Sequence, residues 1–238
     1  MKNILFLILI IFGHTTFAQA VSLLNDYTLG EVSVVVFPFG MEYPVKIGRV
    51  SDSGELFLQT PSKLEIDIPA DIKEMSMTDL NSSIYFKCDD PLGMSDVKVI
   101  YAGPIALWTK DDQYAGVLMP VSDEALVPWV EDPMSNEPIK ASFFQLVYVE
   151  TDIELVYDAT CKSTLNTGSG DLVSDYLLDL SLVNGFNWIE YDLESLISYQ
   201  HEGFYDPNTM ETSVLPNRVN ITSVRPDSAK MKWVAKYF

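Results

Sequence analysis

Nearly every apolar segment of this chain alternates apolar with polar residues and ends at Gly, Pro, Asn or Asp. A period of two is typical of strands, because successive side chains of a strand point to opposite faces of the sheet. Clear cases are GEVSVVVFPF, YPVKIGRVSDSGELFLQTP and SFFQLVYVETDIELVYDATC. Strands do not alternate with long helical segments, which excludes a parallel α/β sheet. The pattern therefore predicts an all-β fold of sandwiches or barrels.

Turn residues between these runs predict where consecutive strands pair as hairpins. The predicted turns are Asp52 to Gly54, Lys110 to Gln113, Glu150 to Asp152, and Asn184-Gly185. Only two stretches depart from the strand pattern. PADIKEMSMTDLNSS is predicted to form a turn or two of helix, and YDLESLISYQ to form a short helix or another strand.

The N-terminus reads MKNILFLILIIFGHTTFAQA, with one Lys, an apolar run and small residues ending in Ala-Gln-Ala. This order is typical of a secretory signal peptide, which we assign to residues 1–20. The apolar run is shorter than the roughly 20 residues that a membrane-spanning helix needs. We therefore expect an exported protein, periplasmic or extracellular, with no transmembrane segment after cleavage.

The chain has 34 acidic and 15 basic side chains and a formal net charge of −19. Such a charge repels phosphate backbones, so nucleic acid is not an expected partner. The acids occur as short pairs beside turn residues, which favours a solvated surface. Binding of calcium or of a cationic partner is the alternative. Since 47% of the residues are hydrophobic, the chain can bury a proper core.

A proline-rich, acidic stretch suggests a domain boundary. PVSDEALVPWVEDPMSNEPIKA holds four prolines, which favour an extended linker because proline cannot donate a ladder hydrogen bond. We therefore divide the chain into residues 21–137 and 138–238. The expectation is two Ig-like or prealbumin-like antiparallel β-sandwich domains in tandem.

Two family resemblances accompany this division. GEVSVVVFPFGMEYPVKIGRVSDSGELFLQTP resembles the start of carboxypeptidase-regulatory or prealbumin-like sandwiches, in which a D-x-G turn joins two strands. FFQLVYVETDIELVYDATC followed by DYLLDLSLVNGFNWIEYDL resembles uncharacterised exported proteins of Bacteroidetes-type bacteria. The second resemblance covers roughly fifty residues and implies export and a β-sandwich fold. Neither implies an activity.

The chemistry-bearing residues match few known site patterns. His201 is the only histidine outside the signal peptide, and neither a zinc motif nor a G-x-S-x-G elbow is present. The phosphate-binding glycine motifs are also missing. Asn166, Asp171 and Asp175 have the oxygen ligands that calcium prefers, although an ordinary hairpin loop needs the same residue types. No other cofactor is expected.

The aromatic side chains provide the binding hypotheses. Counting by twos places Phe186 and Trp188 on one face of a strand and Tyr191 on the other. These three, or Trp108 with Tyr114 beside the Lys110 turn, would suit a carbohydrate site, but packing in the core is the more ordinary role. Trp129 lies among prolines, so we expect it to be exposed and to contact a partner.

The two cysteines, Cys88 and Cys161, leave their pairing open. In an exported protein an even number of cysteines favours a disulfide. Each nevertheless lies in a strand-like segment, where a single cysteine often behaves as a small buried apolar residue. The two also fall in different predicted domains.

We therefore expect a non-catalytic binding or structural module of a bacterial cell envelope that engages an envelope protein. A carbohydrate-binding module with a glycan partner is the alternative. A hydrolase that uses two carboxylates is a weaker one, because two carboxylates at the right separation suffice for glycoside hydrolysis.

Overall fold

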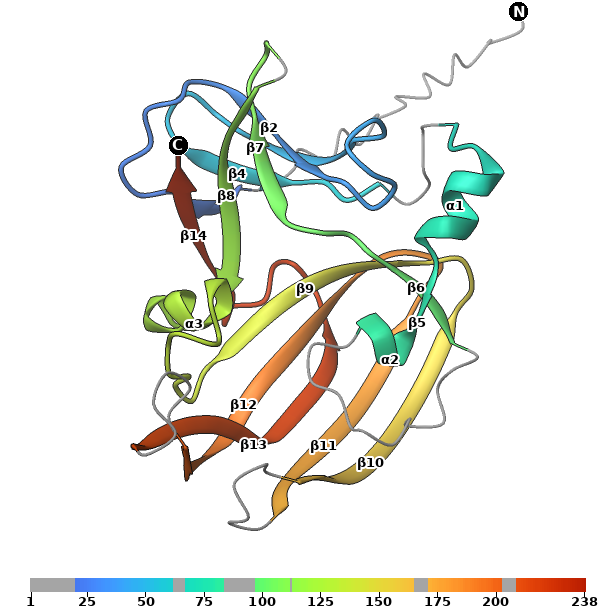
Figure 1. Ribbon diagram of the computed structural model, residues 1–238. Coiled ribbons are helices and arrows are strands. Elements are labelled where there is room, and N and C mark those ends of the chain that lie inside the picture. The colour runs from blue at the N-terminus through green and yellow to red at the C-terminus, as the bar shows by residue number, and fades with distance from the viewer. Residues whose placement is uncertain (1–19, 62–66, 84–96, 112, 165–170, 203–208) are drawn as a thin grey trace, which may run out of the picture.

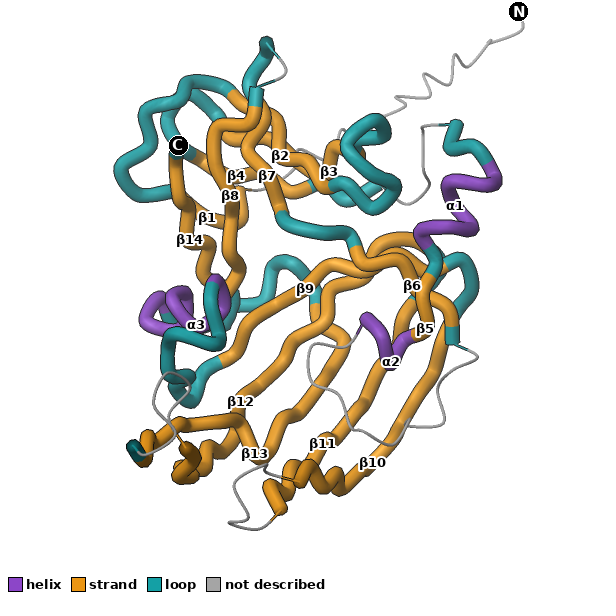
Figure 2. The backbone as a smooth tube through the Cα atoms, in the orientation of Figure 1, coloured by secondary structure: helices purple, strands orange, loops and turns teal. Residues whose placement is uncertain are grey.

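The computed structural model describes residues 20–61, 67–83, 97–111, 113–164, 171–202 and 209–238 (Figure 1). Nearly all regular structure in these residues is β, with three short helices and one 3₁₀ turn (Figure 2). The predicted all-β class is confirmed. None of the helices in the described part of the chain combines the length and apolar character needed to cross a membrane.

The strands form two lobes, which lie above and below each other in Figure 1. The upper lobe contains β1 (Ala20–Leu23), β2 (Val32–Val36), β3 (Val45–Val50), β4 (Glu55–Leu58), β7 (Ile105–Trp108), β8 (Tyr114–Val121) and β14 (Lys232–Tyr237). The lower lobe contains β5 (Thr78–Asp79), β6 (Lys98–Tyr101), β9 (Ser142–Val149), β10 (Ile153–Thr164), β11 (Asp171–Leu182), β12 (Gly185–Glu202) and β13 (Met210–Val224). The helical pieces are α1 (Ala70–Ser76), α2 (Leu80–Ser83), the 3₁₀ turn η1 (Glu124–Leu126) and α3 (Val127–Glu131).

Hydrogen bonding joins both lobes into one sheet with the strand order β1-β4-β3-β2-β7-β8-β9-β12-β13-β11-β10. Strand pairs cross the predicted boundary at residue 138, because β14 pairs with β8 and β6 pairs with β9. The predicted tandem of two Ig-like or prealbumin-like sandwiches is therefore not confirmed. All pairs are antiparallel in the described sheet except β11 with β13.

Two of the predicted hairpins are confirmed. The Asp52 to Gly54 turn joins β3 to β4, and Gly54 adopts a positive φ of 84° that favours glycine. The Lys110 to Gln113 turn joins β7 to β8, with the Gln113 carbonyl accepting from the Thr109 N–H. The helix prediction for residues 69–83 is confirmed by α1 and α2.

The other two hairpin predictions are wrong. β9 pairs with β12 rather than β10, and β13 lies between β11 and β12. The two short connections lie against each other, because the Asn184 N–H donates to Asp152 Oδ1 at 2.8 Å. The chain reverses at Asn184-Gly185 as predicted, but it crosses the end of β13 there instead of returning beside β11.

β9 and β12 are covered on both faces. On β9, Phe143, Val147 and Val149 belong to the core of the lower lobe. The alternate residues Phe144, Leu146 and Tyr148 belong to the upper core. A strand buried on both sides needs a nearly continuous apolar run, which SFFQLVYV supplies.

Candidate functional site

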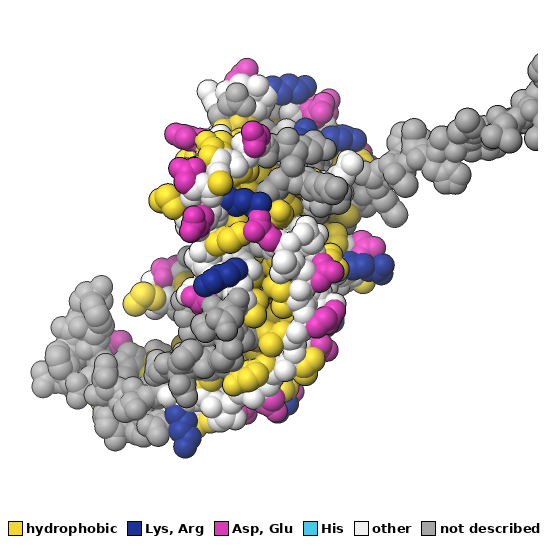
Figure 3. Space-filling model, turned by 90° about the vertical axis from the view of Figure 1, so that its right-hand side faces the viewer, with side chains coloured by type: hydrophobic (Ala, Val, Ile, Leu, Met, Phe, Trp, Pro, Cys, Tyr) yellow, Lys and Arg dark blue, Asp and Glu magenta, His cyan; other side chains and the backbone are white. Residues whose placement is uncertain are grey.

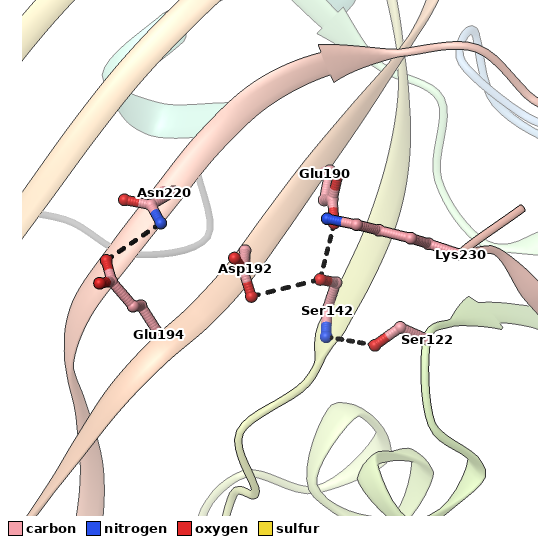
Figure 4. Close-up of polar contacts among 7 residues, drawn as sticks. All are labelled: Ser122, Ser142, Glu190, Asp192, Glu194, Asn220 and Lys230. Carbon is pink, nitrogen blue, oxygen red and sulfur yellow. Dashed lines mark hydrogen bonds and ion pairs between the residues drawn. The ribbon is translucent and has the colours of Figure 1, made fainter. Parts of the chain in front are cut away.

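Two features meet where the lobes join, and the first is a buried polar junction (Figure 4). Ser142 and Glu190 are 3% and 5% exposed. The β9–β12 pairing brings them together, since it places Phe144 opposite Glu190 and Ser142 opposite Asp192. Both side chains lie on the face of the sheet that carries Trp188.

Glu190 has partners that offset the loss of its hydration. The Ser142 hydroxyl donates to Glu190 Oε1 at 2.7 Å, and Lys230 Nζ lies 3.3 Å from the same oxygen. Asp192 Oδ1 is 3.4 Å from the Ser142 hydroxyl, which has one proton and donates to the nearer carboxylate. A buried carboxylate requires such partners, because burial of an unpaired charge costs several kcal/mol.

Ser142 also fastens β9 to the end of β8. Its N–H donates to Ser122 Oγ at 2.7 Å (Figure 4). Its carbonyl accepts from the Ser122 N–H at 2.7 Å. The polar junction, defined as Ser122, Ser142, Glu190 and Lys230, thus connects β8, β9, β12 and the β13–β14 loop.

Carboxylates continue along β12 beyond the junction. Glu194 binds the Arg218 side chain at 2.9 Å and accepts from Asn220 Nδ2 at 3.1 Å. Within the described part of the chain, no three His, Cys, Asp or Glu side chains are grouped as metal ligands. Figure 3 shows Asp and Glu side chains scattered over one face of the molecule rather than gathered in one patch.

The second feature is a cleft of about 430 Å³ between β8 and β9. Its described lining residues are Tyr101, Gly103, Pro104, Ile105, Val117, Leu118, Met119, Pro120, Val130, Glu131, Phe143, Phe144, Gln145, Leu146 and Phe238. Glu131 is the only charged side chain among them, and it pairs with Lys236 at 2.6 Å. The volume lies within the range of about 300 to 1,000 Å³ that is usual for ligand sites.

Two prolines explain why the sheet opens at this point. β8 meets β9 at Val121 and Phe143, and continuing this antiparallel register would place Pro120 opposite Phe144. β6 pairs Ile100 with Tyr148, and the same continuation would place Pro104 opposite Phe144. Proline has no N–H to donate, and Gly103, with φ of 78°, turns the chain just before Pro104.

Most of the aromatic residues that the sequence suggested for binding lie in the core. Trp188 is 3% and Tyr191 0% exposed, so the prediction of an aromatic platform is wrong and their ordinary role in the core is confirmed. Their predicted opposite faces are also confirmed. Tyr191 stacks on Phe143 at 4.7 Å, Trp188 meets Trp233 edge-on at 5.5 Å, and the half-buried Phe186 packs against Tyr148.

The expectation of an exposed Trp129 in an extended linker is wrong. Trp129 is 2% exposed and packs edge-on against Phe143. Its segment forms η1 and α3, since Asp123 caps the 3₁₀ turn and Pro128 occupies the first turn of the helix. Proline is well tolerated there because that N–H has no partner within a helix.

Trp108 and Tyr114 lie opposite each other on β7 and β8, as their flanking of one turn predicts. Trp108 is half-buried against Phe37, and Tyr114 is 46% exposed beside Phe238. Their role in binding a glycan stays a prediction.

The other predicted site residues lie partly outside the described residues. Asn166 is outside them, and nothing is described of the Asp171 side chain. Asp175 accepts from the Thr160 hydroxyl at 2.8 Å. Because the other two predicted ligands are not described, calcium binding stays a prediction. Cys161 is in a disulfide bond, and Cys88, the only other cysteine of the sequence, lies outside the described residues.

Sequence reasoning missed Ser142, Glu190, Phe144 and Gln145. One signal was present for Glu190. Counting by twos from Phe186 and Trp188 places this carboxylate on the same face as two aromatic side chains, where a charge needs a specific partner.

Comparison with protein families, with characterised proteins and with solved structures found no match.

Proposed function

We propose that the protein is an exported, non-catalytic binding module of a bacterial cell envelope that holds a protein partner in the cleft between β8 and β9. The single observation that carries this proposal is the cleft itself. It is apolar, large enough for a ligand group and open where two strands of a continuous sheet diverge.

The polar junction supports binding rather than catalysis at this site. Ser142 and Glu190 bind each other and neither lines the cleft. The backbone bonds of Ser142 to Ser122 hold the ends of β8 and β9 together at one end of the cleft, which keeps the opening in a fixed shape. Fixed sites bind with a smaller loss of conformational freedom. The proposed export depends on the signal-peptide pattern of residues 1–20. The proposed binding role does not depend on a division into Ig-like or prealbumin-like units at residue 138.

Photo-crosslinking in the native cell envelope tests this proposal. A photoreactive phenylalanine derivative replaces Met119, which lines the cleft, or Met134, which is 93% exposed and lies away from it. We expect position 119 to yield one defined protein adduct that position 134 does not. Identical adducts from both positions, or none from position 119, would refute the assigned site.

A glycan-binding surface is the second candidate, because Tyr114 and Phe238 are 46% and 70% exposed and lie in contact. Exposed rings stack on the apolar faces of sugars. The test is a glycan array probed with the wild-type protein and Tyr114→Ala. Glycan binding that Tyr114→Ala abolishes would support this surface, and a blank array would reject it.

A further inference from the structure

We propose that the open edge of β10 is a second protein-binding surface, which pairs with an extended partner segment in which apolar residues alternate with lysine or arginine. This inference goes beyond the proposed function, because the edge and the cleft consist of different residues. β10 is 12 residues long and stands at the end of the strand order (Figure 1). Strands of about 5 or 6 residues are usual, and a long open edge is a template for an added strand.

One hydrogen bond of the neighbouring strand shows which backbone groups of β10 face this edge. The Ser181 N–H of β11 donates to Ser223 Oγ of β13 at 2.9 Å, so it points away from β10. In an antiparallel ladder, two opposite residues either exchange both hydrogen bonds or both point away from each other. Ser181 lies opposite Glu154, and the register continues without a shift along both strands. The N–H and carbonyl groups of Glu154, Val156 and Asp158 therefore face the open edge.

These edge groups have no hydrogen-bond partner within the part of the chain that the structure describes. β11 is the only strand paired with β10 there, and the backbone of residues 154–158 makes no other hydrogen bond. Val156, at the middle of this stretch, is 82% exposed. An incoming strand would bond to these groups in register, which is how exposed sheet edges bind peptide segments.

The inner face of β10 determines one half of the partner's side chains. Ile153 and Leu155 pack against the lower core but are only partly buried, and Tyr157, on the same face, is 37% exposed. Side chains on one face of two paired strands contact each other across the pair. Apolar residues of an added strand would therefore cover Leu155 and Tyr157 and extend the lower core.

The outer face of β10 determines the other half, because it is acidic. Glu154 and Asp158 are exposed on this face, and Asp179 of β11 is exposed opposite Val156. None of these three carboxylates has an ion pair among the residues that the structure describes. A basic residue opposite Glu154 and another opposite Asp158 would each form an opposite-charge pair across the strands.

The same charges disfavour a second copy of this chain as the occupant. Two β10 edges paired antiparallel about Val156 would place Glu154 of each copy opposite Asp158 of the other. Each copy also has a formal net charge of −19. Charged side chains are a usual protection of edge strands against self-association, and here they favour a basic partner.

NMR titration of the isotope-labelled protein tests the pairing. The probe is acetyl-Lys-Val-Thr-Val-Lys-amide, whose sequence is the same in both directions, and acetyl-Glu-Val-Thr-Val-Glu-amide is the charge-reversed control. We expect the lysine peptide to shift the amide signals of Glu154, Val156 and Asp158 more than those of Leu155 and Tyr157, whose N–H groups face β11. The glutamate peptide should bind about 10-fold more weakly.

Reversal of the edge charges provides the matched variants. Glu154→Lys combined with Asp158→Lys should reverse the preference, so that the glutamate peptide binds more tightly. Glu124→Lys combined with Glu137→Lys makes the same change in net charge at exposed positions beside α3, and it should keep the preference for the lysine peptide. If the first double variant fails to fold, Val156→Pro removes one N–H from the open edge and none from the pairing with β11, and it should weaken binding of the lysine peptide.

Three results would overturn the proposal. The first is no binding of the lysine peptide, or equal affinity for both peptides. The second is a preference that the edge variants leave unchanged. The third is slow hydrogen exchange at the Glu154, Val156 and Asp158 amides before any peptide is added, because the edge would then already be occupied. A dimer in analytical ultracentrifugation together with this third result would identify a second copy as the occupant.

Discussion

Ser142 and Phe144 lie two residues apart on β9 and meet the end of β8 in different ways. Ser142 and Phe144 are 3% and 4% exposed, and both direct backbone groups to the outer edge of the strand. At Ser142, the N–H and the hydroxyl of Ser122 satisfy that edge. At Phe144 the facing residue of β8 is Pro120, whose carbonyl faces the Phe144 N–H but which has no N–H to donate to the Phe144 carbonyl, and the cleft begins here. The comparison shows that serine pairs the ends of β8 and β9, whereas proline leaves a backbone carbonyl without a donor and the sheet opens. The hydrogen-bonded junction at Ser142 stabilises the strands beside this opening.

The largest effect should come from removing the carboxylate of the junction. Glu190→Ala leaves the buried Ser142 hydroxyl with only the more distant Asp192 Oδ1, at 3.4 Å, as an acceptor, and removes the partner of Lys230. We expect a loss of about 3 kcal/mol in the free energy of unfolding, measured by urea denaturation. Glu194→Ala is the matched control on the same strand. Its side chain is 47% exposed, so its loss should stay below about 1 kcal/mol. Equal losses would break the comparison.

The lower core covers the face of the sheet opposite to the Phe144 side chain, and it provides a densely packed region with which Ser142 and Phe144 can be compared. Burial raises the pKa of Tyr176, which lies in the lower core, to about 12, while a hydrogen bond with Ser174 lowers it. Between pH 10 and 12 the unfolded chain loses the phenolic proton and the folded chain keeps it, so stability falls as pH rises in that window. The stabilisation is fully present below pH 10.

Tyr176→Phe should therefore weaken the alkaline loss of stability by roughly 2 kcal/mol across this window. The measurement is urea denaturation of wild-type and variant at pH 9 and at several higher values. Tyr157→Phe, on the neighbouring strand β10 and 37% exposed, is the control. An unchanged pH profile in Tyr176→Phe would mean that this face is more open to water than its burial indicates.

Removing the serine hydroxyl should have the next largest effect. Ser142→Ala removes the bond to Glu190 but keeps the backbone bonds to Ser122. We expect a loss of about 2 kcal/mol, because the carboxylate stays buried with only Lys230 as a partner. The control is Ser198→Ala on the exposed part of β12. If the two variants unfold at the same urea concentration, the hydroxyl does not stabilise the junction.

Much of the fold was predictable, because the period of two appears in nearly every strand. The hairpins at Gly54 and at residues 110–113 followed from turn chemistry alone. Turn chemistry fixes where a chain reverses but not which strand fills the neighbouring place. At Asn184-Gly185 that place is taken by β13, which comes later in the sequence, so a local signal could not predict the pairing.

The candidate site was less predictable for a similar reason. The faces of the strand on which Phe186, Trp188 and Tyr191 lie were predicted correctly. The burial of these side chains depends on partners distant in sequence, such as Trp233 and Phe143. The prolines that open the cleft are visible in the sequence. Their significance appears only when the register of β9 places both of them opposite Phe144.

The smallest effect, and the most direct test of the comparison, is amide hydrogen exchange at the two positions of β9. The Ser142 N–H is bonded to Ser122 Oγ, and the register of β8 on β9 directs the Phe144 N–H to the Pro120 carbonyl. At similar burial, we expect the two amides to exchange at rates within about threefold of each other. Two-dimensional NMR after transfer to deuterium oxide measures both rates in one sample. A Phe144 amide that exchanges more than about tenfold faster would show that β8 and β9 already part at Pro120.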